Sequence, residues 1–257
     1  MSFDVKKVHT DLVRWIKDWF ADKGNAPVVI GLSGGKDSTI CAKLLTEALG
    51  KERVIGVLMP NGEQKDISDS YKVCEILGIK PNVVNIADAY NGLTNQIRSI
   101  AENGKPFPTP LYSTNTPARL RMTTLYGVAA IYGGFVVNTC NLSESVIGWE
   151  TYGGDGFGDF SPIGLLTKTE VVELGLEMKL PKELVNKTPS DGMCGESDED
   201  KFGFTYAILD KFIREGITDK ELIEKISSMN KRSHFKHENI HIPTFNPNLS
   251  INPILNW

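Results

Sequence analysis

PVVIGLSGGKDSTICAKLL, residues Pro27 to Leu45, joins an apolar, β-branched run to a glycine-rich turn and then to an amphipathic helical pattern. When a strand ends in glycines and leads directly into a helix, the first N–H groups of that helix converge on one point. The helix dipole adds positive potential at the same point. The stretch therefore predicts a phosphate site at the carboxyl end of the first strand.

Two well-known phosphate-binding loops are excluded by single residues. A Walker A loop in register with the Gly-Lys pair needs glycine at position 30 and serine or threonine at position 37, where this chain has Ile30 and Asp37. A dinucleotide-binding fingerprint that starts at Gly31 needs glycine in place of Ser33. An ordinary glycine-rich turn without a ligand is the alternative to an anion site of another kind.

The polar residues of the loop have the chemistry of a nucleotide site. Ser33 and Ser38 can donate hydroxyl hydrogen bonds to phosphate oxygens, and Lys36 supplies a positive charge. Asp37 would repel a bare phosphate. An acidic group in this position therefore predicts a bridging cation, Mg²⁺ carried in with a nucleotide.

The chain around this loop alternates short β-branched runs with helical patterns. We predict strands at 28–32, 54–59, 83–86 and 135–140, and helices at 5–20, 38–49, 67–77, 87–103 and 118–132. Further helices are predicted at 168–179, 200–214 and 218–228, and the tail beyond them is irregular. This order predicts an α/β three-layer sandwich with a central parallel sheet and additional C-terminal helices.

Two more charged residues are expected near the loop. Glu144 follows the strand at 135–140, and the carboxyl ends of parallel strands meet at one edge, so Glu144 should lie near Asp37 and complete a Mg²⁺ clamp. A solvated acid at a helix start is the alternative. Lys168 begins a helix after a glycine-rich loop at 148–164 and is expected to reach the phosphates, with a surface lysine as the alternative.

Composition restricts the class of protein. At 257 residues, with 40% hydrophobic residues and a formal charge of −4, the chain is expected to form a single domain over 1–257, without a membrane segment or a nucleic-acid partner. The four cysteines are far apart and lack zinc-site spacing. The N-terminus mixes charges with apolar residues and is no signal peptide, so a cytoplasmic location is expected.

The motif SGG-x-DS resembles the pyrophosphate loop of the N-type ATP pyrophosphatases, which cleave ATP between the α- and β-phosphates and have an adenine nucleotide alpha hydrolase-like, Rossmann-like fold. Four further segments resemble one branch of that group, the ammonia-dependent NAD synthetases. They are NTPARLRM at 115–122, TCNLSESVIGWETYGGDGFGDFSPIGLLTK at 139–168, KTPSDGM at 187–193 and DEDKFGFTYAILD at 198–210.

The resemblance implies roles for individual residues. ATP contacts fall on Gly31, Leu32, Ser33, Gly34, Gly35, Lys36, Asp37, Ser38, Thr139, Lys168 and Ser190, and metal contacts on Asp37 and Glu144. Contacts to deamido-NAD fall on Arg119, Tyr152, Asp159, Lys236 and His237. Lys36 and Lys168 are expected to be catalytic, and Asp155 is a candidate for removing a proton from the nitrogen nucleophile.

The chain departs from the family pattern at several of these positions. Tyr152 stands where many members have a substrate-binding lysine, and Leu58 where many have an arginine. In the tail, Phe235 replaces a histidine and His237 an arginine, so that only Lys236 matches securely. Arg121, two residues beyond Arg119 on a predicted helix, is expected to point elsewhere.

The resemblance implies ATP-dependent amidation of deamido-NAD by ammonia, which gives NAD, AMP and pyrophosphate through an adenylated intermediate. Glutamine-using members carry an extra amidohydrolase domain for which a chain of this length has no room, so ammonia from solution or a separate subunit is expected. The family implies a homodimer, to which the aromatic N-terminal helix is a candidate contributor. A tRNA-thiolating enzyme and a nucleotide-binding relative without turnover are the alternatives.

Overall fold

A parallel sheet forms the centre of the computed structural model, which describes residues 3–101, 106–186, 198–217, 219–238 and 241–256. Its order is β3-β2-β1-β4, formed by Val28–Gly31 (β1), Val54–Leu58 (β2), Pro81–Val83 (β3) and Phe135–Val136 (β4). Val28 pairs with Val54 on one side and with Phe135 on the other. Because β1 is central and all strands run the same way, the loop after β1 leaves from the middle of the carboxyl edge.

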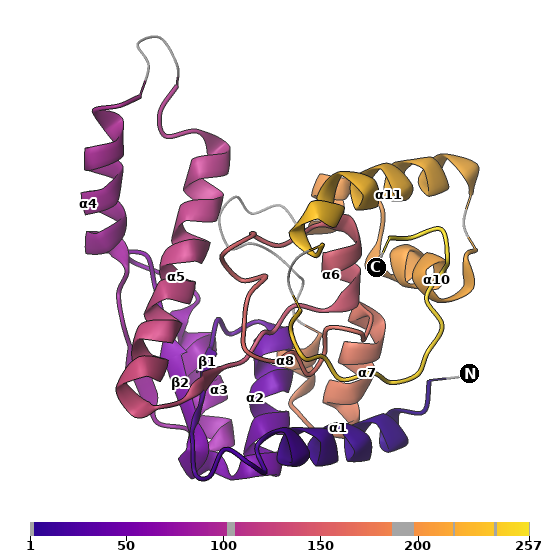
Figure 1. The fold of residues 1–257 in the computed structure, drawn as a ribbon, viewed down its shortest axis with the longest axis horizontal. Coiled ribbons are helices and arrows are strands. Elements are labelled where there is room, and N and C mark those ends of the chain that lie inside the picture. Colours follow the sequence, from indigo (N-terminus) through magenta and orange to yellow (C-terminus); the bar gives the residue numbers. More distant parts are fainter. Residues whose placement is uncertain (1–2, 102–105, 187–197, 218, 239–240, 257) are drawn as a thin grey trace.

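Helices make up most of the remaining structure (Figure 1). The described helices are Val5–Trp19 (α1), Lys36–Leu49 (α2), Ile67–Leu77 (α3), Ala87–Arg98 (α4), Pro110–Tyr132 (α5), Leu142–Ile147 (α6), Lys168–Glu177 (α7), Lys182–Val185 (α8), Asp198–Phe202 (α9), Tyr206–Glu215 (α10) and Lys220–Ser233 (α11), with 3₁₀ turns at Lys51–Arg53 and His234–Lys236.

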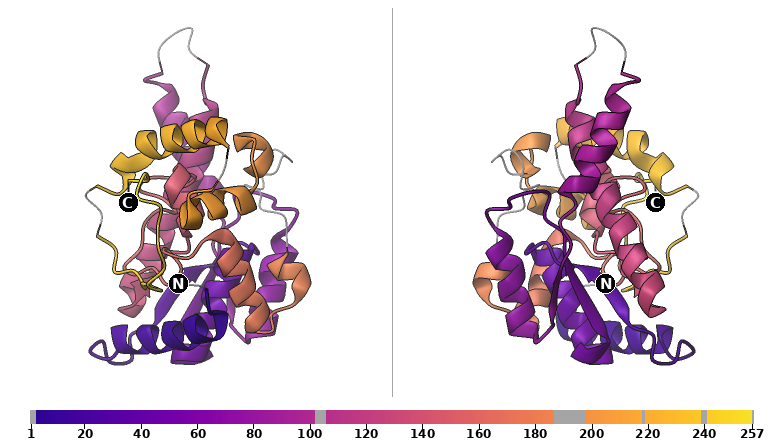
Figure 2. Two further views of the ribbon diagram at one scale, coloured as in Figure 1. Left: turned by 90° about the vertical axis from the view of Figure 1, so that its right-hand side faces the viewer. Right: turned by 90° about the vertical axis from the view of Figure 1, so that its left-hand side faces the viewer.

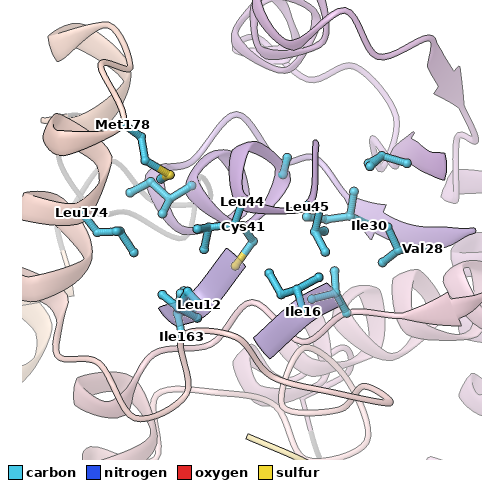
Figure 3. Close-up of a cluster of buried hydrophobic side chains, with 14 of the residues drawn as sticks. Leu12, Ile16, Val28, Ile30, Cys41, Leu44, Leu45, Ile163, Leu174 and Met178 are labelled. Atoms are coloured by element: carbon cyan, nitrogen blue, oxygen red, sulfur yellow. The ribbon is translucent and has the colours of Figure 1, made fainter. Parts of the chain in front are cut away.

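The sheet is covered on both faces, as the strand pattern predicts. Alternate residues of β1 point to opposite faces. Val28 and Ile30 belong to a buried cluster with α1, α2 and α7, whereas Val29 belongs to a second cluster with residues of α5. Figure 3 shows side chains from α1, β1, α2 and α7 meeting in the first cluster. The predicted three-layer α/β sandwich is confirmed.

The additional C-terminal helices form a third buried cluster beside the sheet. Leu142 and Val146 of α6 pack with Leu209 and Phe212 of α10 and with Ile226 of α11. Figure 2 shows α10 and α11 on the same side of the molecule, away from the α4–α5 pair. This cluster packs α6, which carries Glu144, against α10 and α11.

Several predicted boundaries move. The predicted helix at 67–77 is confirmed to the residue, but the strand predicted at 83–86 is Pro81–Val83, and the strand predicted at 135–140 ends at Val136. Beyond Val136 the chain pairs with the glycine-rich loop instead, through a bridge from Val137 to Phe160. The helix predicted at 200–214 is two helices, α9 and α10, separated by Gly203 with its positive φ of +74°.

Helix α5 begins eight residues before the predicted start at 118. Thr109 caps it by accepting the N–H of Tyr112 at 3.1 Å, and Pro110 occupies its first turn. Pro117 lies inside the helix, although proline normally interrupts the hydrogen-bond ladder of a helix. Pattern alone therefore underestimates this helix, which carries Arg119 and Arg121.

The aromatic face of α1 packs within the chain. The ring of Trp19 stacks on Phe160 with centroids 4.4 Å apart, and Trp15 packs against Phe245 at 6.0 Å. These rings are therefore engaged in the subunit's own core, which revises the expectation that they serve a subunit interface. Within the described ranges, each helix is too short or too polar to cross a bilayer.

Candidate nucleotide and amidation site

The glycine-rich loop leaves the first turn of α2 open to a ligand. Gly35 is the N-cap of α2 and provides no side-chain cap, so the first N–H groups of the helix are not covered by a capping side chain. Gly34 has a positive φ of +75°, and a Cβ at this position would lie 2.8 Å from the Cβ of Asp69. Glycine is therefore required here by conformation and by space.

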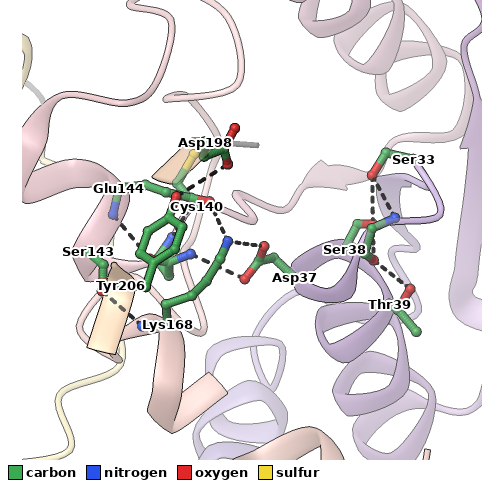
Figure 4. Close-up of polar contacts among 12 residues, drawn as sticks. Ser33, Asp37, Ser38, Thr39, Cys140, Ser143, Glu144, Lys168, Asp198 and Tyr206 are labelled. Carbon is green, nitrogen blue, oxygen red and sulfur yellow. Dashed lines mark hydrogen bonds and ion pairs between the residues drawn. The ribbon is translucent and has the colours of Figure 1, made fainter. Parts of the chain in front are cut away.

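The serines of the loop hydrogen-bond to each other and to the loop backbone (Figure 4). Ser33 Oγ accepts the N–H of Gly35 at 3.2 Å and lies 3.2 Å from Ser38 Oγ, which donates to the carbonyl of Gly35. Lys36 is almost fully buried beside them, and burial together with the nearby charge of Lys168 lowers the pKa of its ammonium group. The predicted loop residues thus lie together at the carboxyl end of β1.

A buried ammonium group joins three helices at this edge. Lys168 Nζ lies 2.8 Å from Asp37 Oδ2 and 2.7 Å from Glu144 Oε1. Asn141 Nδ2 donates to the other oxygen of Asp37 at 3.2 Å. The three charged residues come from the first turns of α2, α6 and α7 (Figure 4), which brings Glu144 next to Asp37 as the strand order predicts.

Reciprocal capping boxes fix the residues at which α6 and α7 begin. In α6, Asn141 accepts the N–H of Glu144 while the Glu144 carboxylate accepts the N–H of Asn141. In α7, Thr167 and Glu170 form the same reciprocal box. Ser143 accepts the N–H of Lys168 at 2.9 Å. The carboxylate of Asp210 accepts hydrogen bonds from Ser143 and from the N–H of Thr169.

The electrostatics of the cluster follow from its burial. Desolvation raises the pKa of Glu144 to about 7, against the opposing attraction of Lys168, and the charge of Asp37 raises it further. Burial alone would lower the pKa of Lys168, but the two carboxylates outweigh it and raise that pKa. Lys168 thus stays charged, and it balances two acids that would otherwise repel each other.

The donor set fits a hard divalent cation that also binds phosphate. Asp37 and Glu144 offer carboxylate oxygens, the ligands that Mg²⁺ prefers. No group of three or more His, Cys, Asp or Glu suited to a metal exists among the described residues. A cation here would therefore take its remaining ligands from a nucleotide and from water, as the sequence predicts.

Asp155 and Arg121 lie close together behind this cluster. Asp155 Oδ1 accepts the N–H of Thr151 at 2.8 Å, and burial raises the pKa of the carboxyl group. Arg121 is also largely buried, interacts with the charge of Asp155 and donates from Nε to the carbonyl of Met59 at 3.0 Å. Arg121 therefore points away from Arg119, whose Nε donates to the carbonyl of Tyr152, and it is held by a main-chain contact, as expected.

Arg121 also bears on the missing arginine at position 58. Leu58 is 1% exposed and belongs to the core, so its side chain does not reach a ligand. The guanidinium of Arg121 instead brings a positive charge to the end of β2, at Met59. The motif NTPARLRM contains this arginine, but only the tertiary packing shows where it goes.

Four residues predicted to contact the dinucleotide lie near one another. Arg119 Nε donates to the carbonyl of Tyr152 at 3.1 Å. Lys236 Nζ donates to the carbonyls of Gly148 and Glu150 at 2.8 and 2.5 Å. His237 Nε2 lies 2.8 Å from the Glu150 carboxylate. The tail is therefore bound to the segment 148–152, and Lys236 holds it there through main-chain carbonyls.

The remaining predicted residues have other surroundings. Asp159 accepts the N–H of Val136 at 2.7 Å and the hydroxyl of Tyr126 at 3.3 Å, so each of its carboxylate oxygens has a partner within the chain. Thr139 follows β4, between Asn138 and Cys140. Ser190 lies outside the described residues.

Sequence reasoning missed several residues that build the site. Asn141 binds Asp37, Asp210 supports α7, and the ring of Tyr206 lies 5.0 Å from Lys168 Nζ. The pattern N-x-x-E at 141–144 is a capping signal that identifies Asn141 in advance. Asp210 and Tyr206 fall in the quoted segment DEDKFGFTYAILD, but nothing in their spacing shows that Asp210 binds the start of α7 or that Tyr206 lies next to Lys168.

Comparison with known proteins gives one family. Residues 8–240 match the family model described as NAD synthase. The ammonia-dependent NAD(+) synthetase of Pyrococcus horikoshii is 36% identical over 241 residues, which cover 88% of this chain and 91% of that protein.

Two solved structures are similar over nearly the whole chain. The NMN synthetase from Francisella tularensis has a TM-score of 0.84 and 32% identity, covering 95% of this chain and all of that one. The ammonia-dependent NAD synthetase from Campylobacter jejuni has a TM-score of 0.73 and 27% identity, covering 94% of this chain and 99% of that one.

Replacing Lys168 tests the cluster. Lys168→Met leaves Asp37 and Glu144 close together without their cation, so we expect the free energy of unfolding to fall by about 3 kcal/mol. Added Mg²⁺ should restore more stability to this variant than it adds to the unchanged protein, because the freed carboxylates bind the ion in the native state only. Denaturant unfolding with and without Mg²⁺ measures both effects.

Lys36→Met is the matched control. Lys36 is also nearly buried, but it forms no ion pair with the described residues, so its loss should cost much less stability and should not increase the effect of Mg²⁺. Equal costs for the two variants, or an equal Mg²⁺ effect in all three proteins, would contradict this account of the cluster.

Proposed function

Because the chain belongs to the NAD synthase family, we propose that it amidates deamido-NAD with ammonia at the expense of ATP, giving NAD, AMP and pyrophosphate. The observation that carries this proposal is the ammonium group of Lys168 between Asp37 and Glu144, beside an uncapped helix start. Such a site offers hydrogen-bond donors for phosphate oxygens and, within a few ångströms, a pair of carboxylates that can bind a cation. Both are needed to bind ATP and to stabilise its departing pyrophosphate.

The ATP half of the site divides into an anion cradle and a cation clamp. The open N–H groups of α2, the hydroxyls of Ser33 and Ser38 and the ammonium of Lys36 bind phosphate oxygens. Asp37 and Glu144 hold Mg²⁺, which when bound neutralises charge on the leaving pyrophosphate. The ammonium of Lys168 then turns from the carboxylates to the phosphates. Thr139 and Ser190 are assigned to ATP by family resemblance.

The reaction proceeds through an adenylate. The nicotinate carboxylate attacks the α-phosphorus of ATP, and the bond to the β-phosphate oxygen breaks. Ammonia then attacks the acyl carbon, the bond from that carbon to AMP breaks, and the nitrogen loses a proton. Asp155 is the proposed acceptor of this proton, because burial raises the pKa of its carboxyl group and so makes the carboxylate a better base.

The other substrate is assigned to the region where the tail meets the glycine-rich loop. Arg119, Tyr152, Lys236 and His237 gather at 148–152, and Asp159 lies farther along the same loop. Ammonia is proposed to come from solution or from a separate subunit, with 1–257 acting as one domain. A cytoplasmic location is supported by the buried free thiols of Cys41, Cys74 and Cys140.

A second product is a candidate because of one comparison. A structure that is 32% identical over nearly the whole chain carries the name NMN synthetase. Amidation of nicotinate mononucleotide uses the same carboxylate and the same adenylate chemistry. The two substrates differ only in what lies beyond the first phosphate. The tRNA-thiolating alternative has less support, because burial raises the pKa of the Cys41 and Cys140 thiols and makes them poor nucleophiles.

A single assay tests the proposed function. Purified protein is incubated with ATP, Mg²⁺, ammonium and deamido-NAD, and NAD and pyrophosphate are quantified together. We expect equal amounts of the two products during turnover, no NAD and at most about one pyrophosphate per site when ammonium is omitted, and neither product when Mg²⁺ is omitted. ATP binding without product would favour a nucleotide-binding relative, and pyrophosphate release only with tRNA would favour a thiolase.

Asp155→Asn tests the proton acceptor. The amide keeps the size of the side chain but cannot accept a proton, so we expect turnover at saturating ammonium to fall about 100-fold or more. The KM for ATP should stay the same, because Asp155 is not assigned to ATP. Unchanged turnover at saturating ammonium would remove Asp155 from this role.

We propose a homodimer formed through the outer surface of α4 and α5. These helices lie side by side and project from the body of the molecule (Figures 1 and 2). Leu93 of α4, Ile100 just after α4 and Leu111 of α5 are 41%, 79% and 70% exposed. Exposed apolar side chains gathered on one projecting element favour a second copy of the chain as the partner.

Sedimentation velocity tests the dimer. Leu111→Glu should shift the protein towards the monomer, because a charge would be buried in the interface. Ile254→Glu is the control. Ile254 is 61% exposed and belongs to the C-terminal segment, not to α4 or α5. A monomeric unchanged protein, or equal shifts for both variants, would rule out this interface.

A further inference from the structure

Helix α10 supplies a buried carboxylate to the first turn of the helix that carries Lys168. Asp210 is 4% exposed, and its two oxygens have different partners. Oδ1 accepts the hydroxyl proton of Ser143, in the first turn of α6. Oδ2 accepts the N–H of Thr169, in the first turn of α7, at 2.8 Å. Asp210 therefore contacts both of the helices that bring Glu144 and Lys168 to the site.

The hydroxyl group of Ser143 connects this carboxylate to Lys168. Ser143 is fully buried, and its Oγ accepts the N–H of Lys168 at 2.9 Å (Figure 4). Because a hydroxyl group has a single proton, donating it to Asp210 leaves the lone pairs of Oγ for the N–H of Lys168. The N–H groups of residues 168 and 169 are thus both held by one side chain of α10, the first through Ser143 and the second directly.

The ammonium group of Lys168 depends on this support, because it lies at the end of a flexible side chain. It pairs with Asp37 and Glu144 at 2.8 and 2.7 Å, and the proposed function requires it to turn to the phosphates of ATP. A lysine side chain can reach two targets from one backbone position, but a shift of that position changes its distance from both. Misplacing a catalytic group by about 1 Å can slow a reaction about 100-fold.

A second side chain of α10 holds the same interface in a different way. Arg214, four residues after Asp210, forms a two-point ion pair with the carboxylate of Glu170, at 2.8 and 2.6 Å. The pair joins α10 to α7, but it does not include the N–H of Lys168 or the hydroxyl of Ser143. Arg214 is therefore a natural comparison for Asp210, on the same helix and against the same turn.

We propose that Asp210 is a positioning residue for amidation: through Ser143 and the N–H of Thr169, it fixes the backbone of Lys168 so that the ammonium group meets the departing pyrophosphate. This inference rests on the proposed function. It assigns the effect of Asp210 to the first half of the reaction, in which the substrate carboxylate attacks the α-phosphorus and the bond to the β-phosphate oxygen breaks. The later attack of ammonia breaks no bond to pyrophosphate and should not depend on Asp210.

Asp210→Asn tests the positioning role without a change in side-chain size. An amide has one acceptor oxygen, so its NH₂ group must face either Ser143 or the N–H of Thr169, and one accepted hydrogen bond is lost. We expect kcat for NAD formation to fall about 10- to 100-fold, with KM for ATP and deamido-NAD within about threefold of the original. Rapid-quench measurement of pyrophosphate in the first turnover should show the same fall. An unchanged kcat, or a rise in KM alone, would overturn the inference.

Arg214→Met is the matched control for general loosening of the interface. It leaves the Glu170 carboxylate buried without its partner, so it should lower the denaturation midpoint. Measured well below that midpoint, its kcat should stay close to that of the unchanged protein. Equal losses of kcat in Arg214→Met and Asp210→Asn would show that α10 supports the fold in general and that Asp210 has no special role.

Ser143→Ala tests the route from Asp210 to Lys168. The variant removes the acceptor for the N–H of Lys168, so kcat should fall, again with little change in KM. If Asp210 acts partly through Ser143, the loss in the double variant Asp210→Asn/Ser143→Ala should be clearly smaller than the product of the two single losses. Losses that multiply would show two independent effects and would contradict the route.

A comparison of stabilities tests the positioning without turnover. Asp210→Asn is introduced into the unchanged protein and into Lys168→Met, and the denaturation midpoints are compared. If Asp210 holds the ammonium group between its two carboxylates, the substitution should lower the midpoint less when that group is absent. Equal shifts in both backgrounds would overturn the inference. Failure of the unchanged protein to form NAD would instead overturn the proposed function, and the stability comparison would still decide whether Asp210 positions Lys168.

Discussion

The ammonium group of Lys168 between Asp37 and Glu144 is the interaction on which the rest of the site depends. It draws together the first turns of three helices that leave different parts of the chain, α2, α6 and α7. A buried ion triad of this kind is costly to desolvate and is weak evidence for stability. Here the triad matters because it fixes positions. It holds two carboxylates together at one edge of the sheet, and strand order alone would not keep them together.

The fold was largely predictable because its signals are local. Apolar β-branched runs, glycine stops and capping residues mark β1, β2 and α3 correctly, and parallel strand order then places Glu144 near Asp37. The errors in the predicted element boundaries arise from contacts that a local sequence pattern does not show. Pairing with the 159–160 segment shortens β4, and Pro117 hides the true start of α5 because proline is tolerated inside this helix.

The site was predictable as a set of residues but not as a set of contacts. Lys168 was expected at the phosphates, and in the structure its charge is paired with two carboxylates, an outcome that depends on burial and not on spacing. Arg121 points away from Arg119, as expected, but its contact at the end of β2, where Leu58 offers no charge, depends on tertiary packing. In both cases the partner lies far along the chain, at Asp37 or at Met59.

The cations near the site are held by different parts of the fold. Lys36 lies in the first turn of α2, Lys168 of α7 is paired with Asp37 and Glu144, Arg121 donates to the carbonyl of Met59, and Lys236 is held by carbonyls. Arg119 keeps its outer nitrogens for a ligand, since among the described residues its only hydrogen bond runs from Nε to the carbonyl of Tyr152.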